Sequence, residues 1–304
     1  MSASAWLWIP LVLAAAAAQT VRNAAQRNLI ATAGTLPATF VRFFYGLPFV
    51  VAGYIAARAL TPDAIPAPPA VFFGWVAVGA LGQLAATALL LAAMARRSFI
   101  VAVAYSKTEL VQIVVYSIVL LGESVSAATV AAIVLATLGV VLLSVKGASD
   151  RGATVQSWLS PAAFLGLGCG SGFALSAVGY RGAALTLGEL PVWITGTYAV
   201  MWGQAMQSVV LGSYLVLRDR RGLREVVVQW RISALAGLMG ALASIGWMMA
   251  FAMKSAADVR TVGLVEVLYG YALSRRVFRE PVSGRELTGI ILVAAGIVVI
   301  SVTL

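Results

Sequence analysis

"RNLIATAGTLP" occupies residues 27–37, and "RGAALTLGELP" occupies residues 181–191. The two stretches carry Arg, Thr, Gly, Leu and Pro at the same relative positions, always 154 residues apart. A connecting segment that occurs twice in one chain indicates an internal duplication, which predicts further matches between the two halves of the sequence.

A second pair of matching stretches follows at a spacing of 157 residues. "LGESVS" at 121–126 corresponds to "FREPVS" at 278–283, and Ser98, Ser117 and Ser144 each have a Ser counterpart. Chance similarity between apolar helices is the alternative explanation, but charged, Pro and Ser matches at fixed offsets disfavour it. We therefore predict two repeats, residues 1–148 and 152–304, joined by a short polar linker.

Composition assigns the chain to the membrane proteins. Of its 304 residues, 61% are hydrophobic and 11% are charged, whereas a soluble domain has roughly a quarter charged. Apolar runs of about twenty residues recur, which is the length that crosses a bilayer core as a helix. Continuous runs disfavour a β-barrel, whose strands alternate. The predicted fold is an all-α polytopic membrane protein.

Ten candidate transmembrane spans lie between the polar breaks of the sequence. The first is Ala-rich, but no Lys or Arg precedes Arg22, so we interpret it as a retained helix and not as a secretion signal. The ninth is the least secure, since Arg260 and Glu266 interrupt it. The spans are 5–25, 37–57, 70–92, 99–121, 125–145, 158–180, 191–216, 232–252, 257–275 and 286–304.

Five spans per repeat is an odd number, so the second repeat must enter the membrane from the opposite side. Inverted repeats of this kind are common in secondary transporters, which bind substrate between the halves. Odd-numbered connections carry 15 Lys and Arg and even-numbered ones carry 4. The positive-inside rule places the 15 in the cytoplasm, so both termini are expected on the extracytoplasmic side of a bacterial-type inner membrane.

The Lys and Arg residues of these connections explain the net charge of +10, and we expect them to anchor the protein to an anionic lipid leaflet. We expect the lipid bilayer and a small-molecule substrate as partners, no nucleic acid, and a monomer or homodimer. The single cysteine, Cys169, excludes an intramolecular disulfide and a cysteine metal cluster, and is expected to be a buried, inert thiol. No cofactor and no metal are predicted.

The "LGES…G" and "REPV…G" endings, each followed by a final apolar helix, resemble the EamA type of the drug/metabolite transporter superfamily. The resemblance implies ten helices in two inverted five-helix repeats and transport of small metabolites, often amino acids, outward. The chain departs from many relatives, which have a basic connection after the second span and termini inside. The direction of transport is therefore not carried over from them.

Polar side chains within the spans are the candidates for the transport pathway, because they are costly in lipid and tend to face a wet interior. Glu109 and Glu266, which match at the offset of 157, are candidates for binding a cationic amine or exchanging a proton. The alternative is that each pairs with a nearby Arg or caps a broken helix. Lys107 would either hold a substrate carboxylate or pair with an acid.

The candidate substrate-binding residues include a helical stripe in the fourth span and amides or aromatic groups elsewhere. Such amides can also simply hold helices together. The residues are Gln19, Asn23, Gln83, Thr87, Tyr105, Lys107, Glu109, Gln112, Tyr116, Trp202, Gln204, Trp247, Glu266 and Tyr269.

Several other features receive structural interpretations. We interpret Arg42 as an interfacial anchor, and Trp6, Trp8, Trp158, Trp193 and Trp230 as an interfacial belt. The run "GLGCGSG" at 166–172 lies in an apolar span with no preceding strand, so Gly168 and Gly172 are expected to permit close helix approach and not to bind phosphate.

Three classes of function are compared. A secondary transporter is favoured; it would export small metabolites such as amino acids. Its variant is a multidrug or cationic-compound exporter coupled to protons through Glu. An enzyme is disfavoured, since the chain has no His and the two mid-span Glu lie 157 residues apart. A membrane assembly subunit is disfavoured by polar residues at equivalent places in both halves.

Overall fold

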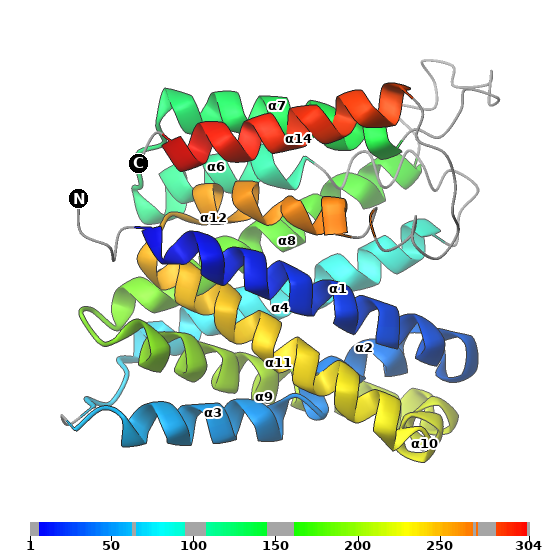
Figure 1. Ribbon diagram of the computed structural model, residues 1–304. Helices are drawn as coiled ribbons and strands as arrows, with labels where there is room; N and C mark the ends of the chain where they lie inside the picture. Colours follow the sequence, from blue (N-terminus) through cyan, green and yellow to red (C-terminus); the bar gives the residue numbers. More distant parts are fainter. Residues whose placement is uncertain are drawn as a thin grey trace. The chain divides into compact units, whose positions relative to one another are not determined.

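The computed structural model describes residues 6–62, 65–94, 108–144, 161–269, 272 and 284–302. These residues form helices and their connections, with no strand among them (Figure 1). The helices are α1 (Trp8–Ala33), α2 (Thr35–Phe44), α3 (Leu47–Ala59), α4 (Ala70–Met94), α6 (Glu109–Leu121), α7 (Ala127–Ser144), α8 (Pro161–Thr186), α9 (Val192–Arg218), α10 (Arg220–Val228), α11 (Trp230–Met253), α12 (Ala256–Gly263) and α14 (Gly284–Val302).

Two compact units make up the chain. Unit 1 comprises Met1–Ala80 and Gly179–Lys254, and unit 2 comprises Leu81–Val178 and Ser255–Leu304. Each unit takes helices from both halves of the sequence, and α4 and α8 each run from one unit into the other. These units are defined by which helices contact one another. The predicted repeats 1–148 and 152–304 are defined by sequence similarity instead, and they stay a prediction.

Four described segments are long and apolar enough to cross a bilayer: Thr35–Ala59, Ala70–Leu89, Val192–Arg218 and Trp230–Met253. α6, α7 and α14 contain shorter apolar stretches. The prediction of a polytopic helical membrane protein is confirmed at this level, whereas the full number of ten spans stays a prediction.

In unit 1, α1 packs along α11 in the opposite direction (Figure 1). Gly246 faces Ala15, and a Cβ atom on Gly246 would lie 2.9 Å from the Cβ of Ala15. Six residues earlier in α11, Gly240 faces Arg22, which is later in α1. Helices in lipid gain little from the hydrophobic effect against one another, so close approach at small residues is what holds such a pair.

α3 and α9 form a second antiparallel pair in unit 1. The indole Nε1 of Trp193 donates to Thr61 Oγ1 at 3.1 Å, and the rings of Tyr54 and Tyr198 lie 5.4 Å apart. These two contacts join the start of α9 to the end of α3 and to its middle. Aromatic packing and one hydrogen bond therefore align the two helices.

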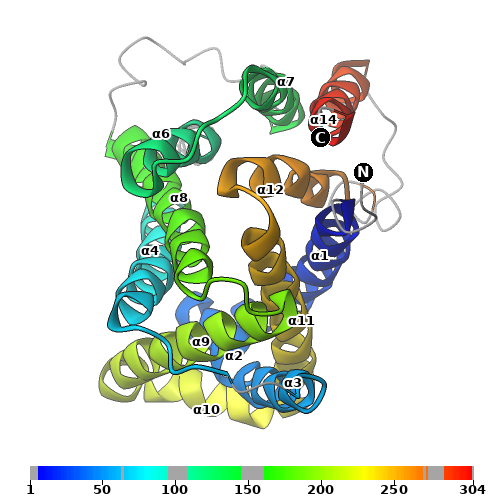
Figure 2. The ribbon, with the colours of Figure 1, turned by 90° about the vertical axis from the view of Figure 1, so that its left-hand side faces the viewer.

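In unit 2, α7 and α14 pack side by side through two glycines (Figures 1 and 2). A Cβ on Gly139 would lie 2.6 Å from the carbonyl oxygen of Gly289, and a Cβ on Gly296 would lie 2.8 Å from that of Ala132. The contact is reciprocal: Gly139 and Gly296 are 157 residues apart, and so are the residues that they contact, Ala132 and Gly289. The helices run antiparallel.

α4 and α8 meet along a line of glycines. In unit 2 a Cβ on Gly172 would lie 2.8 Å from the carbonyl oxygen of Gly82, and in unit 1 one on Gly179 would lie 2.6 Å from the nitrogen of Gly79. The expectation that Gly172 permits close helix approach is confirmed. Cys169, on the same helix, is fully buried, as expected.

The glycine of the duplicated connector has a positive φ in both copies. Gly34 ends α1 with φ at 85°, and Gly188 follows α8 with φ at 63°. L-residues with a side chain rarely adopt this left-handed region, so both copies of the segment need glycine at this place. The sequence match at an offset of 154 thus includes a glycine with positive φ in each copy.

The helix bounds differ from those of three predicted spans, although Thr35–Ala59 is still one candidate span. The first span was expected to end near residue 25, but α1 continues to Ala33 and contains Arg22 and Arg27. The second span is divided into α2 and α3 at Tyr45 and Gly46, where a Cβ on Gly46 would meet the carbonyl oxygen of Arg42. The ninth is interrupted by a turn at Leu264, after α12.

Two side chains differ from the expected interfacial positions. Trp8 is 1% exposed, so it packs inside the protein and is not part of a belt. The Nε and Nη2 atoms of Arg42 are buried, so this guanidinium does not act as an interfacial anchor. Trp6, Trp193 and Trp230 are exposed, and Trp158 lies outside the described residues.

The glycine contacts predict a stability difference. Gly139→Ala and Gly296→Ala should each lower the melting temperature of the detergent-purified protein, because the added methyl groups overpack the α7–α14 contact at a cost of about 1–3 kcal/mol. Gly74→Ala is the control, since Gly74 is exposed in α4 and its Cβ would meet nothing within 4 Å. An equal effect of all three changes would contradict the packing role.

Candidate functional site

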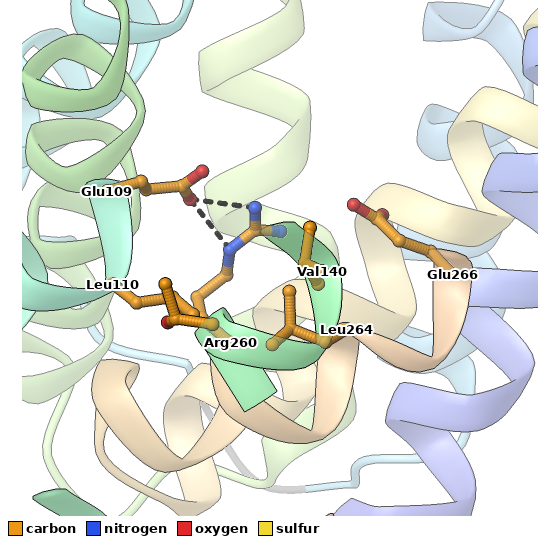
Figure 3. Close-up of a pocket in the computed structure, with 7 residues that line it drawn as sticks. Glu109, Leu110, Val140, Arg260, Leu264 and Glu266 are labelled. Atoms are coloured by element: carbon orange, nitrogen blue, oxygen red, sulfur yellow. Dashed lines mark hydrogen bonds and ion pairs between the residues drawn. The ribbon is translucent and has the colours of Figure 1, made fainter. Parts of the chain in front are cut away.

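A pocket in unit 2 contains three ionisable side chains, Glu109, Arg260 and Glu266 (Figure 3). Glu109 is the first residue of α6, where a negative charge interacts favourably with the helix dipole. Arg260 lies in the last turn of α12, where a positive charge is favoured for the same reason. Glu266 follows the turn at Leu264 in the helical segment 265–269.

The side chains of Arg260 and Glu109 form an ion pair. Arg260 donates from Nη2 to Glu109 Oε1 at 2.7 Å and from Nε to the same oxygen at 2.9 Å. The Arg260 side chain is 21% exposed and that of Glu109 is 13% exposed, so the pair lies mostly out of solvent. The alternative interpretation of Glu109, that it pairs with an Arg, is therefore the one found.

Glu266 lies on the opposite side of the Arg260 guanidinium from Glu109 and lines the same pocket (Figure 3). Leu110, Thr137, Val140 and Leu264 complete the lining. The enclosed space takes about one water molecule. The arrangement can therefore hold water or a proton between two carboxylates and one guanidinium, but in this conformation it has no room for an amino acid.

The other polar residues of the α6 stripe join α6 to α8. Gln112 Nε2 donates to Thr108 Oγ1 at 2.8 Å and to the carbonyl oxygen of Leu167 at 3.4 Å. The hydroxyls of Tyr116 and Ser171 are hydrogen-bonded at 2.6 Å. These contacts hold two helices of unit 2 together, as polar groups in membrane proteins often do.

The remaining candidates in unit 2 lie on α4 and after α12. The Thr87 hydroxyl donates to the carbonyl oxygen of Gln83 at 2.9 Å within α4, and both residues are half-buried. Tyr269 is half-buried in the segment 265–269. Tyr105 and Lys107 lie outside the described residues.

Five sequence candidates belong to unit 1. Trp247 Nε1 donates to Gln19 Oε1 at 3.2 Å, which joins α11 to α1. Asn23 is exposed and accepts from its neighbour Arg22. Gln204 is buried in α9, and Trp202 is 40% exposed with its ring edge-on to Phe73. The predicted set thus divides into two groups, one in each unit.

Sequence reasoning missed the buried cationic residues of unit 1. Arg22 was counted among the 15 Lys and Arg of the odd-numbered connections, but it is 8% exposed inside α1. Arg42 was interpreted as an interfacial anchor, but it is half-buried in α2. Tyr180, 5% exposed on α8, was not considered. The available signal was the position of Arg42 within "FVRFF" (40–44), an apolar run where a charge must either reach water or be held by protein.

Residues 6–145 match the model of the EamA-like transporter family. The match covers slightly less than half of the chain, so residues 6–145 are what is similar to the EamA type of the drug/metabolite transporter superfamily. Proteins of the EamA family are transporters and not enzymes. The resemblance to this family is thereby confirmed for the first half of the chain, and the match supports a multi-pass membrane protein.

Comparison with solved structures gives a chain of similar fold. One similar structure is titled "Crystal structure of protein". It matches this chain with a TM-score of 0.71 and 16% sequence identity, and the match covers 98% of this chain and 95% of the other. At this identity the similarity concerns the fold alone. The comparison with curated proteins found no match.

The ion pair predicts coupled stability effects. Glu109→Gln and Arg260→Gln should each lower the melting temperature in detergent, because each leaves the opposite charge without its partner out of solvent. The double variant should lose less than the sum of the two, with a coupling energy of roughly 0.5–3 kcal/mol. Glu189→Gln, at an exposed position, is the control and should change nothing. Additive losses would contradict the pairing.

Proposed function

We propose that this chain is a secondary transporter of the inner membrane that exports small metabolites, amino acids or similar zwitterionic solutes, by alternating access. The observation that carries the proposal is one pocket that contains the guanidinium of Arg260 and two carboxylates, Glu109 and Glu266, which occupy matching positions in the two sequence repeats. Intramembrane ionisable groups of this kind mark ion pathways and proton relays.

The packing of repeat-related helices supports an inverted duplication. α7 and α14 correspond at the offset of 157, run antiparallel and contact each other reciprocally through Gly139 and Gly296. α3 and α9 correspond at the offset of 154 and are also antiparallel. Such repeats provide two equivalent arrangements of one structure, which is the basis of alternating access.

Charge in the pocket supports a coupling role for the carboxylates. With all three groups ionised, Glu109, Arg260 and Glu266 together carry one negative charge, and uptake of one proton makes them neutral. In this structure Arg260 binds Glu109. Protonation of Glu109 would release Arg260 toward Glu266, so the proton and the conformational change would be linked through exchange of a single cation between two acids.

The ion pair also favours zwitterionic over purely cationic solutes. A cation exporter that used Glu109 would need this carboxylate available to its ligand, whereas the described conformation neutralises Glu109 with Arg260. A zwitterion carries its own counter-charge and therefore does not need to displace Arg260. Both termini on the extracytoplasmic side are part of this proposal, supported by the surplus of Arg in the connection that contains α10.

The flux of solutes through reconstituted protein tests the function. Proteoliposomes that contain the purified chain should release a mixed pool of labelled amino acids, unchanged, faster than protein-free liposomes. An imposed pH gradient should alter that release. Absence of release for every member of the pool, from protein shown to be folded, would overturn the transport proposal.

The coupling role is tested separately with the carboxylates. Glu109→Gln and Glu266→Gln should remove the pH dependence of the flux, since a glutamine cannot take up a proton, while solute exchange in the absence of a pH gradient persists. Glu189→Gln, exposed before α9, serves as the control with unaltered pH dependence. Unchanged flux and pH dependence in both pocket variants would remove the proton role and leave the transport proposal intact.

A further inference from the structure

Unit 1 contains a second group of buried polar side chains, separate from the Glu109 pocket. We call it the basic cluster and define it by Arg22 of α1, Arg42 of α2, Tyr180 of α8 and Gln204 of α9. Arg22, Tyr180 and Gln204 are 8%, 5% and 3% exposed, and Arg42 is half-buried. Charged groups in the interior of a membrane protein are costly to keep without a functional reason.

Glycines bring the members of the basic cluster together. A single Cβ atom on Gly240 of α11 would lie 3.3 Å from Arg22 Cδ and 3.3 Å from Arg42 Cβ, so both side chains pass over this glycine. A Cβ atom on Gly46 would lie 3.0 Å from Gln204 Oε1 and would also meet the carbonyl oxygen of Arg42. The two arginines and the amide therefore lie around the end of α2.

The charge of Arg42 has no hydrogen-bond acceptor on the edge that is buried. Its Nε and Nη2 atoms are inaccessible to solvent and have no hydrogen-bond partner in the described chain, and the same is true of Gln204 Oε1. Arg42 is close enough to Arg22 and Tyr180 for its charge to interact with both. A buried donor without a partner is destabilising, and a second positive charge nearby adds to this effect.

The arrangement of the free donors identifies the chemical group that fits them. The Nε–H and one Nη2–H of a guanidinium point in parallel and match the two oxygens of a carboxylate. One face of the Arg42 guanidinium lies 4.4 Å from the centre of the Phe43 ring, which holds the plane without using either donor. Arg22 donates from its own Nε and Nη2 to Asn23 Oδ1, which is a neutral acceptor.

We propose that Arg42 binds the carboxylate of the transported solute through its Nε and Nη2 atoms, with Arg22 adding positive potential and Gln204 Oε1 able to accept from the solute's amine. This inference rests on the proposed transport function and names the substrate class as carboxylates that also carry an amine. It gives Arg42 the role that the sequence suggested for Lys107.

The experiment uses the full chain in detergent and two sets of matched probes. One set is L-alanine, L-alaninamide and propionate; the other is L-phenylalanine, L-phenylalaninamide and 3-phenylpropionate. Ligand-induced increases in melting temperature, followed over a concentration series, give the affinities. At least one probe with a carboxylate should bind, and the amide of the same set should bind about tenfold or more weakly, because it cannot neutralise the guanidinium.

Variants of Arg42 link that binding to its guanidinium. Arg42→Gln should weaken carboxylate binding by about tenfold or more, and Arg42→Lys should retain part of it, since an ammonium keeps the charge but loses the paired donors. Arg231→Gln is the matched control: it removes the same charge from an exposed position at the start of α11.

Stability without ligand separates a binding role from a structural one. Arg42→Gln should melt at the same temperature as the wild-type protein or higher, because it removes a buried charge with unpaired donors. A structural arginine would instead lose stability when replaced. Equal binding of acids and amides, no binding of any carboxylate probe, or unchanged affinity in folded Arg42→Gln would overturn the proposal.

The outcomes distinguish this inference from the transport function. If amino-acid flux occurs but Arg42→Gln leaves affinity unchanged, the transport function stands and Arg42 is not the carboxylate site. If carboxylates bind through Arg42 but no flux occurs in liposomes, the binding site stands and the transport function fails.

Discussion

Close contact between backbones at glycine is the constraint on which the rest of this structure depends. Helices that are surrounded by lipid cannot gain stability by burying apolar surface against one another, so dispersion forces and interhelical hydrogen bonds must suffice. Gly139 with Gly289, Gly82 with Gly172 and Gly246 with Ala15 each allow such an approach. Polar side chains then come close enough to bridge helices, as Gln112 and Tyr116 do between α6 and α8.

Ionisable groups are placed in two different ways by this packing. In unit 2 a cation and an anion meet, so the Glu109–Arg260 pair is largely self-compensating and leaves Glu266 beside it. In unit 1 the cations gather around the end of α2, and none of the described residues supplies an acceptor for the buried edge of Arg42. The acidic pocket of unit 2 is suited to exchange of a proton, and the basic cluster of unit 1 is suited to binding the anionic group of a ligand.

Much of the helical architecture could be predicted from hydropathy, because apolar length directly reflects the thickness of a bilayer. The repeated connector indicated a duplication, and its glycine has a positive φ in both copies, at Gly34 and Gly188. Sequence reasoning failed where a charge is stabilised by protein and not by water. It ended the first span near Arg22, which instead remains in α1 and donates to Asn23, and it could not identify Arg260 as the partner of Glu109, because that contact joins residues distant in sequence.

The separation of 151 residues between Glu109 and Arg260 has a consequence for biogenesis. A ribosome that adds about 5–20 residues per second delivers the arginine roughly 8–30 seconds after the glutamate. During that interval the first half of the chain must shelter an acidic side chain within the translocon, at the lipid boundary or by protonation. The early helices therefore reach their final packing only after the late helices have been inserted. Until then, the N-terminal half of the nascent chain is suited to assistance by membrane insertases.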